Sequence, residues 1–335
     1  MRRTYRVAAA AAFGGGGVGL VGALAAALIV GQARLARWTI PRAESPPPRC
    51  DGRYGTEHPG EPIRLALLGD SSAAGYGVEL PRETPGALLA TGLVEWLRRP
   101  VVVRSLAVVG ATSTGLVPQR ELALAWRPDV AVILIGGNDV THRVRVGTAV
   151  GHLAETVGLL RAAGARVIVG TCPDLGTIRP IQPPLRWLVR RWSRELAAAQ
   201  TIAVVEAGGT SVSLGDLLGP EFAASPETMF AADRFHPSAA GYRAAVLAML
   251  PSVISAAGGT PEIGPVPVPG DGVRSLAQAA VEAVDQAGTE VSGTRVAGQE
   301  RGPAGRWATL RHRLRIRVER PRDPVDPGRI EEARS

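Results

Sequence analysis

Residues 65–77 read Leu65-Ala66-Leu67-Leu68-Gly69-Asp70-Ser71-Ser72-Ala73-Ala74-Gly75-Tyr76-Gly77, an apolar run followed by small and polar residues. The apolar run predicts a buried β-strand, and the Gly-Asp-Ser triplet predicts the turn that ends it. Ligands bind at the carboxyl ends of strands in open α/β sheets, and small neighbours let a substrate approach the backbone. The turn therefore suits a nucleophilic Ser71, although a serine there can instead cap the next helix.

Similar apolar runs recur along the central part of the chain. We expect strands at residues 63–69, 101–108, 129–135, 165–171 and 202–206, and helices at residues 85–98, 116–126, 148–164, 184–200 and 238–257. Strands that are nearly continuous apolar runs and alternate with helices predict a parallel sheet that is covered on both faces. The expected fold is α/β, a three-layer sandwich with a five-stranded parallel sheet in flavodoxin-like order, and its site lies at the carboxyl ends of the strands.

The first segment of the chain, residues 1–37, predicts contact with a membrane. A short basic start precedes an uncharged stretch from Val7 to Gln32, which exceeds the roughly 18 apolar residues that mark a membrane span. We expect an uncleaved N-terminal anchor; the alternative is a signal peptide that is removed on secretion. Arginines flank the stretch on both sides, so the positive-inside rule does not decide its orientation. The expected location of the domain that follows this segment is extracytoplasmic.

Composition changes mark the other boundaries of the 335-residue chain. Residues 38–62 are rich in proline, glycine and charge and predict a linker, residues 63–257 form the expected domain, and residues 258–272 predict a second linker. Residues 273–335 predict a short helix and a basic, partly disordered tail.

The net charge of +8 lies largely in this tail and beside the N-terminal stretch, so it predicts no specific nucleic-acid partner for the central domain. The basic segment 306–318 could contact an anionic surface, or it could be a solvated tail.

The two cysteines, Cys50 and Cys172, are too few for a disulfide-rich scaffold. They also lie in no Cys-x-x-Cys or Cys/His cluster of the kind that holds zinc. Either they form a single bridge in an oxidising compartment, or they are small buried residues or free thiols.

Four short polar segments carry the chemical signal, and three of them follow predicted strands. They are Gly69-Asp70-Ser71, Val109-Gly110-Ala111-Thr112, Gly136-Gly137-Asn138-Asp139 and, before the last helix, Asp233-Arg234-Phe235-His236-Pro237. In this order they resemble the four blocks of the SGNH hydrolase superfamily, the GDSL-type esterases and lipases. The resemblance spans residues 63–257. It implies the α/β sandwich fold and a serine hydrolase activity.

The residue types support a Ser-His-Asp triad independently of the resemblance. The hydroxyl of Ser71 is a poor nucleophile at neutral pH and needs a base, for which His236 is the candidate. Asp233 lies three residues before His236, so its carboxylate can fix the imidazole tautomer and stabilise the imidazolium.

The resemblance further implies an oxyanion hole made of the backbone N–H groups of Ser71 and Gly110 and the side-chain amide of Asn138. We assign Asp70 and Asp139 a structural role in holding the loops of Ser71 and Asn138.

The predicted function is hydrolysis of carboxylic esters through an acyl-enzyme intermediate on Ser71, without metal or cofactor. The substrate is expected to be a small-molecule, glycan or lipid ester. The arginines and tryptophans of residues 186–192 either form an amphipathic helix or line a rim that meets substrate. Two other classes stay open: a non-catalytic envelope binding module on the same fold, and a metal-dependent phosphoesterase, which would need more His and Asp ligands.

Overall fold

The computed structural model describes residues 23–35, 46–215 and 225–259, together with short segments between residues 280 and 300. Within these residues, nine strands form one sheet in the order β1-β3-β2-β4-β5-β6-β7-β8-β9. Its centre consists of five parallel strands: β3 (Val101–Ser105), β2 (Ile63–Gly69), β4 (Val130–Leu134), β5 (Arg166–Gly170) and β6 (Thr210–Val212). This is the predicted flavodoxin-like order, since the first parallel strand lies between the second and the third.

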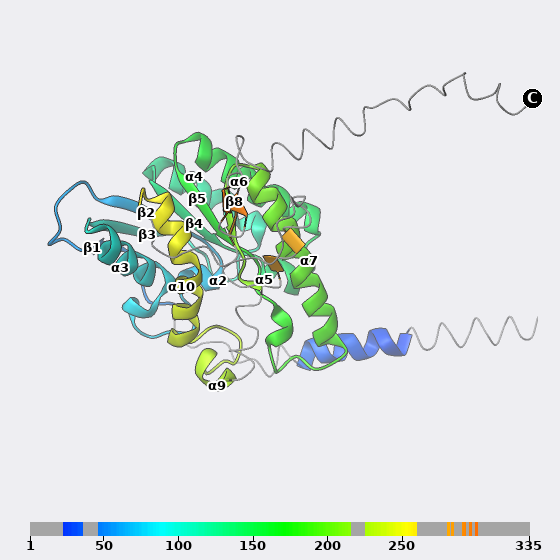
Figure 1. The fold of residues 1–335 in the computed structure, drawn as a ribbon. Coiled ribbons are helices and arrows are strands. Elements are labelled where there is room, and N and C mark those ends of the chain that lie inside the picture. Colours follow the sequence, from blue (N-terminus) through cyan, green and yellow to red (C-terminus); the bar gives the residue numbers. More distant parts are fainter. Residues whose placement is uncertain are drawn as a thin grey trace, which may run out of the picture.

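The central strands are apolar on both faces because both faces are covered. In β4 all five residues are buried, and Leu65 and Leu67 of β2 are 0% exposed. Helices α3 (Pro85–Leu97) and α10 (Ala239–Ala256) cover one face, while α4 (Leu116–Trp126), α6 (Val146–Ala162) and α7 (Leu185–Glu206) cover the other (Figure 1). The three-layer sandwich expected from the alternating pattern is therefore present.

Short elements lie in the connections between these strands and helices. The helices are α2 (Ser71–Ala74), α5 (Gly137–Thr141) and α9 (Pro226–Met229), and the 3₁₀ turns are η1 (Pro81–Glu83), η2 (Ser113–Gly115) and η3 (Leu175–Thr177). Helices α2 and α5 follow β2 and β4 directly, so both begin at the carboxyl edge of the sheet.

The fifth strand is not where the sequence predicts it. Residues 202–206 continue helix α7 to Glu206, and the strand follows at Thr210–Val212. A short apolar run fits a buried helix as well as a strand. Here Leu196, Gln200 and Val204 are buried at the four-residue spacing of one helix face. Gly208, with a φ of +83°, then turns the chain into β6.

Both edges of the parallel sheet are extended by antiparallel strands from segments expected to lie outside the domain. Strand β1 (Gly52–Tyr54) pairs with β3, which corrects the expectation that all of residues 38–62 form a linker. Strand β7 (Glu290–Ser292) pairs with β6, and β8 (Arg295–Val296) and β9 (Gln299–Glu300) continue the sheet, so part of residues 273–335 is not a tail. These strands satisfy backbone groups that an open edge would leave unpaired.

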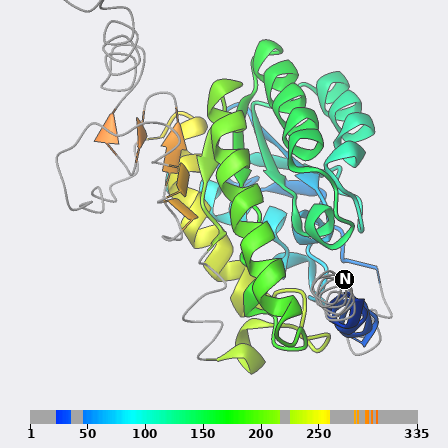
Figure 2. The same cartoon turned by 90° about the vertical axis from the view of Figure 1, so that its right-hand side faces the viewer.

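An apolar helix near the N-terminal end, Ala23–Leu35, lies beside the start of α7 (Figures 1 and 2). Ile29 and Ala33 pack against the buried cluster around α7. The side chain of Gln32 donates to the carbonyl of Pro183 at 2.6 Å and accepts from the N–H of Leu185 at 3.1 Å. Among the described residues, the helix that is long and apolar enough to cross a membrane is α10, which covers the sheet as a core helix.

Several expectations fall on residues outside the described part of the chain. They are the first part of the Val7–Gln32 stretch, most of the linker 258–272 and the basic segment 306–318. Cys50 and Cys172 are both described; they are buried free thiols in different core clusters, so the alternative of a bridge between them is wrong.

Candidate active site

Ser71 stands at the carboxyl end of β2, as the first residue of α2. Asp70 caps this helix by accepting the N–H of Ser72 at 2.8 Å. Gly69 has a φ of +133°, and a Cβ atom there would lie 1.8 Å from the carbonyl oxygen of Leu134. Only glycine fits this position, because β2 and β4 approach each other closely where the chain turns toward Ser71.

Ser71, His236 and Asp233 form a continuous chain of hydrogen bonds. Nε2 of His236 lies 2.9 Å from Oγ of Ser71, and Nδ1 of His236 lies 2.6 Å from Oδ2 of Asp233. With Asp233 ionised, Nδ1 must carry the proton and donate it, so Nε2 of the neutral ring accepts from the Ser71 hydroxyl. Residues that are 165 positions apart in the chain thus meet at one edge of the sheet.

The turn before α10 orients both His236 and Asp233. Oδ1 of Asp233 accepts the backbone N–H groups of Phe235 and His236, each at 2.9 Å. The rings of Tyr76 and Phe235 contact the imidazole edge-to-face, with centroid distances of 4.6 and 4.9 Å. The hydroxyl of Tyr242 donates to the carbonyl of Tyr76 at 2.7 Å and so holds this wall against α10. The imidazole is therefore fixed on several sides.

Two carboxylates near Ser71 have opposite pKa shifts. Burial favours the neutral form of Asp233, but the hydrogen bonds from the His236 ring and from the two backbone N–H groups outweigh it and lower the pKa of Asp233. For Asp70, burial dominates over the hydrogen bonds from Ser72 and raises its pKa to about 6. Asp233 is thus suited to pair with an imidazolium, whereas Asp70 is a buried cap.

Asn138 is the second residue of α5 and lines the same cavity as Ser71 and His236. Its Nδ2 donates to the carbonyl of Ala111 at 3.0 Å, which leaves the second N–H of the amide for another acceptor. Gly110 lies in the neighbouring turn, which is closed by a hydrogen bond from the N–H of Ala111 to the carbonyl of Val108. Gly110 has a φ of +82° and is exposed. It is not among the residues that line the cavity.

Asp139 ties the second and third polar segments together. Its carboxylate is buried and accepts the backbone N–H of Ser113 at 3.0 Å and the Ser113 hydroxyl at 3.0 Å. Burial raises the pKa of Asp139 despite these hydrogen bonds. These contacts hold the loop of Gly110 against the loop of Asn138.

Two buried glutamines that the sequence analysis did not single out clamp the strand ends beneath these loops. Gln119 of α4 accepts the N–H of Gly69 at 2.7 Å and donates to its carbonyl at 2.9 Å. Gln200 of α7 accepts the N–H of Cys172 at 2.7 Å and donates to the carbonyl of Ile135 at 3.0 Å. The available signal was a polar residue on the apolar face of each helix, since Leu116, Gln119 and Ala123 share one buried face.

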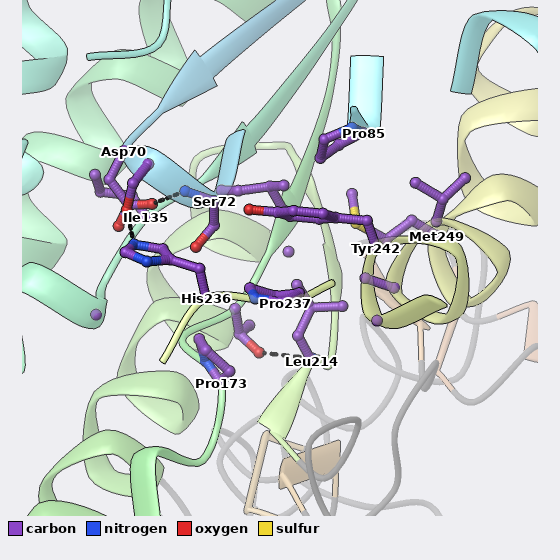
Figure 3. Close-up of a pocket in the computed structure, with 18 of the residues that line it drawn as sticks. Asp70, Ser72, Pro85, Ile135, Pro173, Leu214, His236, Pro237, Tyr242 and Met249 are labelled. Carbon is purple, nitrogen blue, oxygen red and sulfur yellow. Dashed lines mark hydrogen bonds between the residues drawn. The ribbon is translucent and has the colours of Figure 1, made fainter. Parts of the chain in front are cut away.

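A cavity of about 80 Å³ opens at Ser71 and His236 (Figure 3). Most of its lining is apolar and comes from α10, α3, the ends of β4 and β5, and the loop after β5. Asp174 anchors this loop: its buried carboxylate accepts the N–H of Gly176 and pairs with Arg190 of α7 at 3.1 Å. The arginine-rich start of α7 therefore helps to hold the cavity wall.

The remaining reactive groups do not extend the site. Burial raises the pKa of the Cys172 thiol well above its usual value, so it stays protonated. Within the described segments, no three His, Cys, Asp or Glu side chains gather as a metal would require.

The chain is similar to several known proteins. Residues 67–244 match the model of the GDSL-like lipase/acylhydrolase family. The GDSL-like esterase Rv1075c of Mycobacterium tuberculosis is 44% identical over 253 residues, which cover 72% of this chain and 80% of that protein. An arylesterase of Vibrio mimicus is 27% identical over 106 residues, or 32% of this chain and 52% of that protein. Axe2, an acetylxylan esterase from Geobacillus stearothermophilus, aligns with a TM-score of 0.43 and 20% identity over 61% of this chain and 99% of its own.

Proposed function

Since the chain belongs to the GDSL-like lipase/acylhydrolase family and is a serine carboxylic ester hydrolase, we propose that Ser71, His236 and Asp233 carry out the hydrolysis through an acyl-enzyme. The observation that carries this proposal is the hydrogen-bonded chain from Ser71 Oγ through His236 to Asp233, at 2.9 and 2.6 Å. Both distances lie within the reach that proton transfer requires.

In the acylation step, Ser71 Oγ forms a bond to the ester carbonyl carbon while its proton moves to Nε2 of His236. The imidazolium that results is stabilised by Asp233, whose lowered pKa keeps it ionised. When the tetrahedral intermediate collapses, the carbon–oxygen bond to the alcohol breaks and His236 gives its proton to that oxygen. The acyl group then remains on Ser71.

Deacylation repeats these steps with water. His236 removes a proton from water, the hydroxide adds to the acyl carbonyl carbon, and the bond to Ser71 Oγ breaks as the proton returns to Ser71. The products are the carboxylic acid and the free enzyme. Neither step needs a metal ion or a cofactor.

The developing oxyanion accepts hydrogen bonds from the backbone N–H of Ser71 and from the free N–H of Asn138. Gly110 is the third proposed donor. Because the Asn138 amide already contacts Ala111, the turn that contains Gly110 is held beside Asn138. Loss of one such donor typically lowers kcat by about 10²–10³-fold.

Labelling with a fluorophosphonate probe tests the nucleophile. We expect the wild type to be labelled at one serine and Ser71→Ala not to be labelled. Ser72→Ala is the matched control, because it keeps the backbone N–H that Asp70 caps. Equal labelling of wild type and Ser71→Ala, or no labelling of either together with no turnover of p-nitrophenyl acetate, would overturn the assignment. The second outcome is what a non-catalytic binding module predicts.

We also propose that the segment around Val7–Gln32 anchors an extracytoplasmic catalytic domain in a membrane, with secretion after cleavage as the alternative. In its described part, Leu24, Leu28, Val30 and Leu35 are exposed apolar side chains. The ester substrate would then be a small molecule, glycan or lipid at that surface, which the basic segment 306–318 could also contact. Protease treatment of intact cells tests the location, and full protection of the domain would place it in the cytoplasm.

A further inference from the structure

The cavity at Ser71 continues into the layer between α10 and the sheet. Its inner part is formed by Leu89 of α3 and by Val246 and Met249 of α10, which are 0%, 5% and 1% exposed. In Figure 3, Met249 lies beyond Tyr242 as seen from His236, at the far side of the drawn residues. The cavity therefore has a reactive end at the surface and a closed end in the core.

The two ends differ in polarity. Asp70 and His236 line the cavity beside Ser71, whereas the inner residues are aliphatic or methionine. The polar groups between them are already engaged: the Tyr242 hydroxyl donates to Tyr76, and the Thr171 hydroxyl accepts the N–H of Leu214 at 3.2 Å. A polar occupant of the inner part would give up its hydrogen bonds to water and find no new partner there. The inner part therefore suits an apolar occupant.

The dimensions limit the size of this occupant. The path follows α10 from Gly241 to Met249, and eight residues of helix correspond to roughly 12 Å. The volume is about 80 Å³, and a water-sized group needs about 10–15 Å³ of such space, which leaves room for roughly five to eight methylene-sized groups.

The position of the closed end indicates whether the cavity suits the acyl part or the alcohol part of the ester. The alcohol must leave past His236 and be replaced by water, so it needs a route to solvent. The acyl chain stays bonded to Ser71 while the alcohol leaves and water enters, and it leaves as the carboxylic acid, through the mouth of the cavity, only after deacylation. A closed apolar cavity beneath Ser71 thus favours the acyl side.

Resting on the proposed function, we propose that this cavity binds a linear acyl chain of roughly five to eight carbons. Met249 closes its inner end and sets the chain-length limit. The substrate class is then an ester of a short- to medium-chain fatty acid, with its alcohol outside the cavity.

The kinetics of p-nitrophenyl esters with acyl chains from acetate to dodecanoate test this proposal, because the leaving group is constant. Each buried methylene is expected to raise kcat/KM about threefold to fourfold until the cavity is full, after which the value falls. Met249→Ala enlarges the inner end and is expected to move the optimum to longer chains. Met249→Trp is expected to move the optimum toward acetate.

Leu247→Ala is the matched control, since Leu247 lies on the same helix but is 62% exposed. Its optimum should equal that of the wild type. Thermal unfolding of each variant shows whether it is folded, and Met249→Ala keeps the test valid if Met249→Trp does not fold.

A flat acyl-length profile, or identical optima for wild type and Met249→Ala, would overturn the acyl proposal while fluorophosphonate labelling at Ser71 stayed intact. A series of acetate esters with longer alcohols gives the opposite check. If the Met249 substitutions shift that series instead, the cavity holds the alcohol and the proposal is wrong. Absence of both labelling and turnover would instead count against the proposed function itself.

Discussion

The clamp between Gln119 and Gly69 allows a stability prediction to be worked from individual hydrogen bonds. In Gln119→Leu the side chain keeps a similar size but loses both hydrogen bonds to the Gly69 backbone. The carbonyl of Gly69 retains a partner, because it also accepts the N–H of Val108 at 3.0 Å. The N–H of Gly69 retains none among the hydrogen bonds of the described residues.

These two losses have different magnitudes. A buried donor left unsatisfied costs about 1–3 kcal/mol, and a hydrogen bond whose acceptor keeps another partner contributes about 0.5–1.5 kcal/mol. We therefore expect Gln119→Leu to lower the free energy of unfolding by about 1.5–4.5 kcal/mol. Because Gly69 precedes Asp70 and Ser71, the same change should slow fluorophosphonate labelling of Ser71 by roughly tenfold or more, since small misplacements of reacting groups are costly.

Equilibrium unfolding in urea, followed by tryptophan fluorescence, measures the first quantity. Gln182→Leu is the control, because Gln182 is an exposed glutamine whose amide donates to Arg179 near the surface. Its free energy of unfolding should change by less than about 0.5 kcal/mol. If Gln119→Leu is destabilised by no more than the control, the clamp does not stabilise this strand end and the reasoning is refuted.

Three further outcomes follow from the geometry of the site. Asp233→Asn should lower kcat by roughly 10³–10⁴-fold, because the amide cannot hold the tautomer or stabilise the imidazolium; p-nitrophenyl acetate kinetics check this, and a loss below tenfold contradicts it. Asp70→Asn should be more stable than wild type above pH 6. The pKa of Asp70 rises from 3.8 to about 6 on folding, so its ionisation removes up to about 3 kcal/mol of wild-type stability between pH 4 and pH 6. Urea unfolding at pH 4, 5, 6 and 7 measures this. If the free energy of unfolding depends on pH equally in wild type and Asp70→Asn, the prediction is wrong. Gly69→Ala should unfold at least about 3 kcal/mol more easily, because its Cβ would overlap the Leu134 carbonyl oxygen; an unchanged melting curve would contradict the close approach of the strands.

The parts of the fold that the sequence predicts well are those whose signal is local and repeated. Strands β2, β3, β4 and β5 lie in nearly continuous apolar runs that end at small or polar residues, so their existence and the parallel sheet can be derived from pattern alone. The fifth strand could not be placed in the same way, because the short apolar run at residues 202–206 fits a buried helix as well as a strand. Its position depends on the packing of Val204 and on the turn at Gly208.

The edges of the sheet required the tertiary structure. Nothing in the composition of residues 52–54 or 290–292 distinguishes them from a linker or tail, and they become strands only because β3 and β6 offer unpaired backbone groups. The same holds for the cysteines: sequence leaves a bridge open, and only the packing puts Cys50 and Cys172 in separate clusters.

The sequence alone identified the polar segments and the residue types that a serine hydrolase needs, because that chemistry depends on short motifs. Distances between segments are set by the sheet, which brings residues separated by more than a hundred positions to one edge. Only the tertiary structure therefore showed that His236 contacts Ser71, that Gln119 and Gln200 clamp the strand ends, and that Met249 lines the same cavity as the nucleophile. The identity of a single residue does not show which distant residue it contacts, whereas a run of apolar residues indicates that the run is buried.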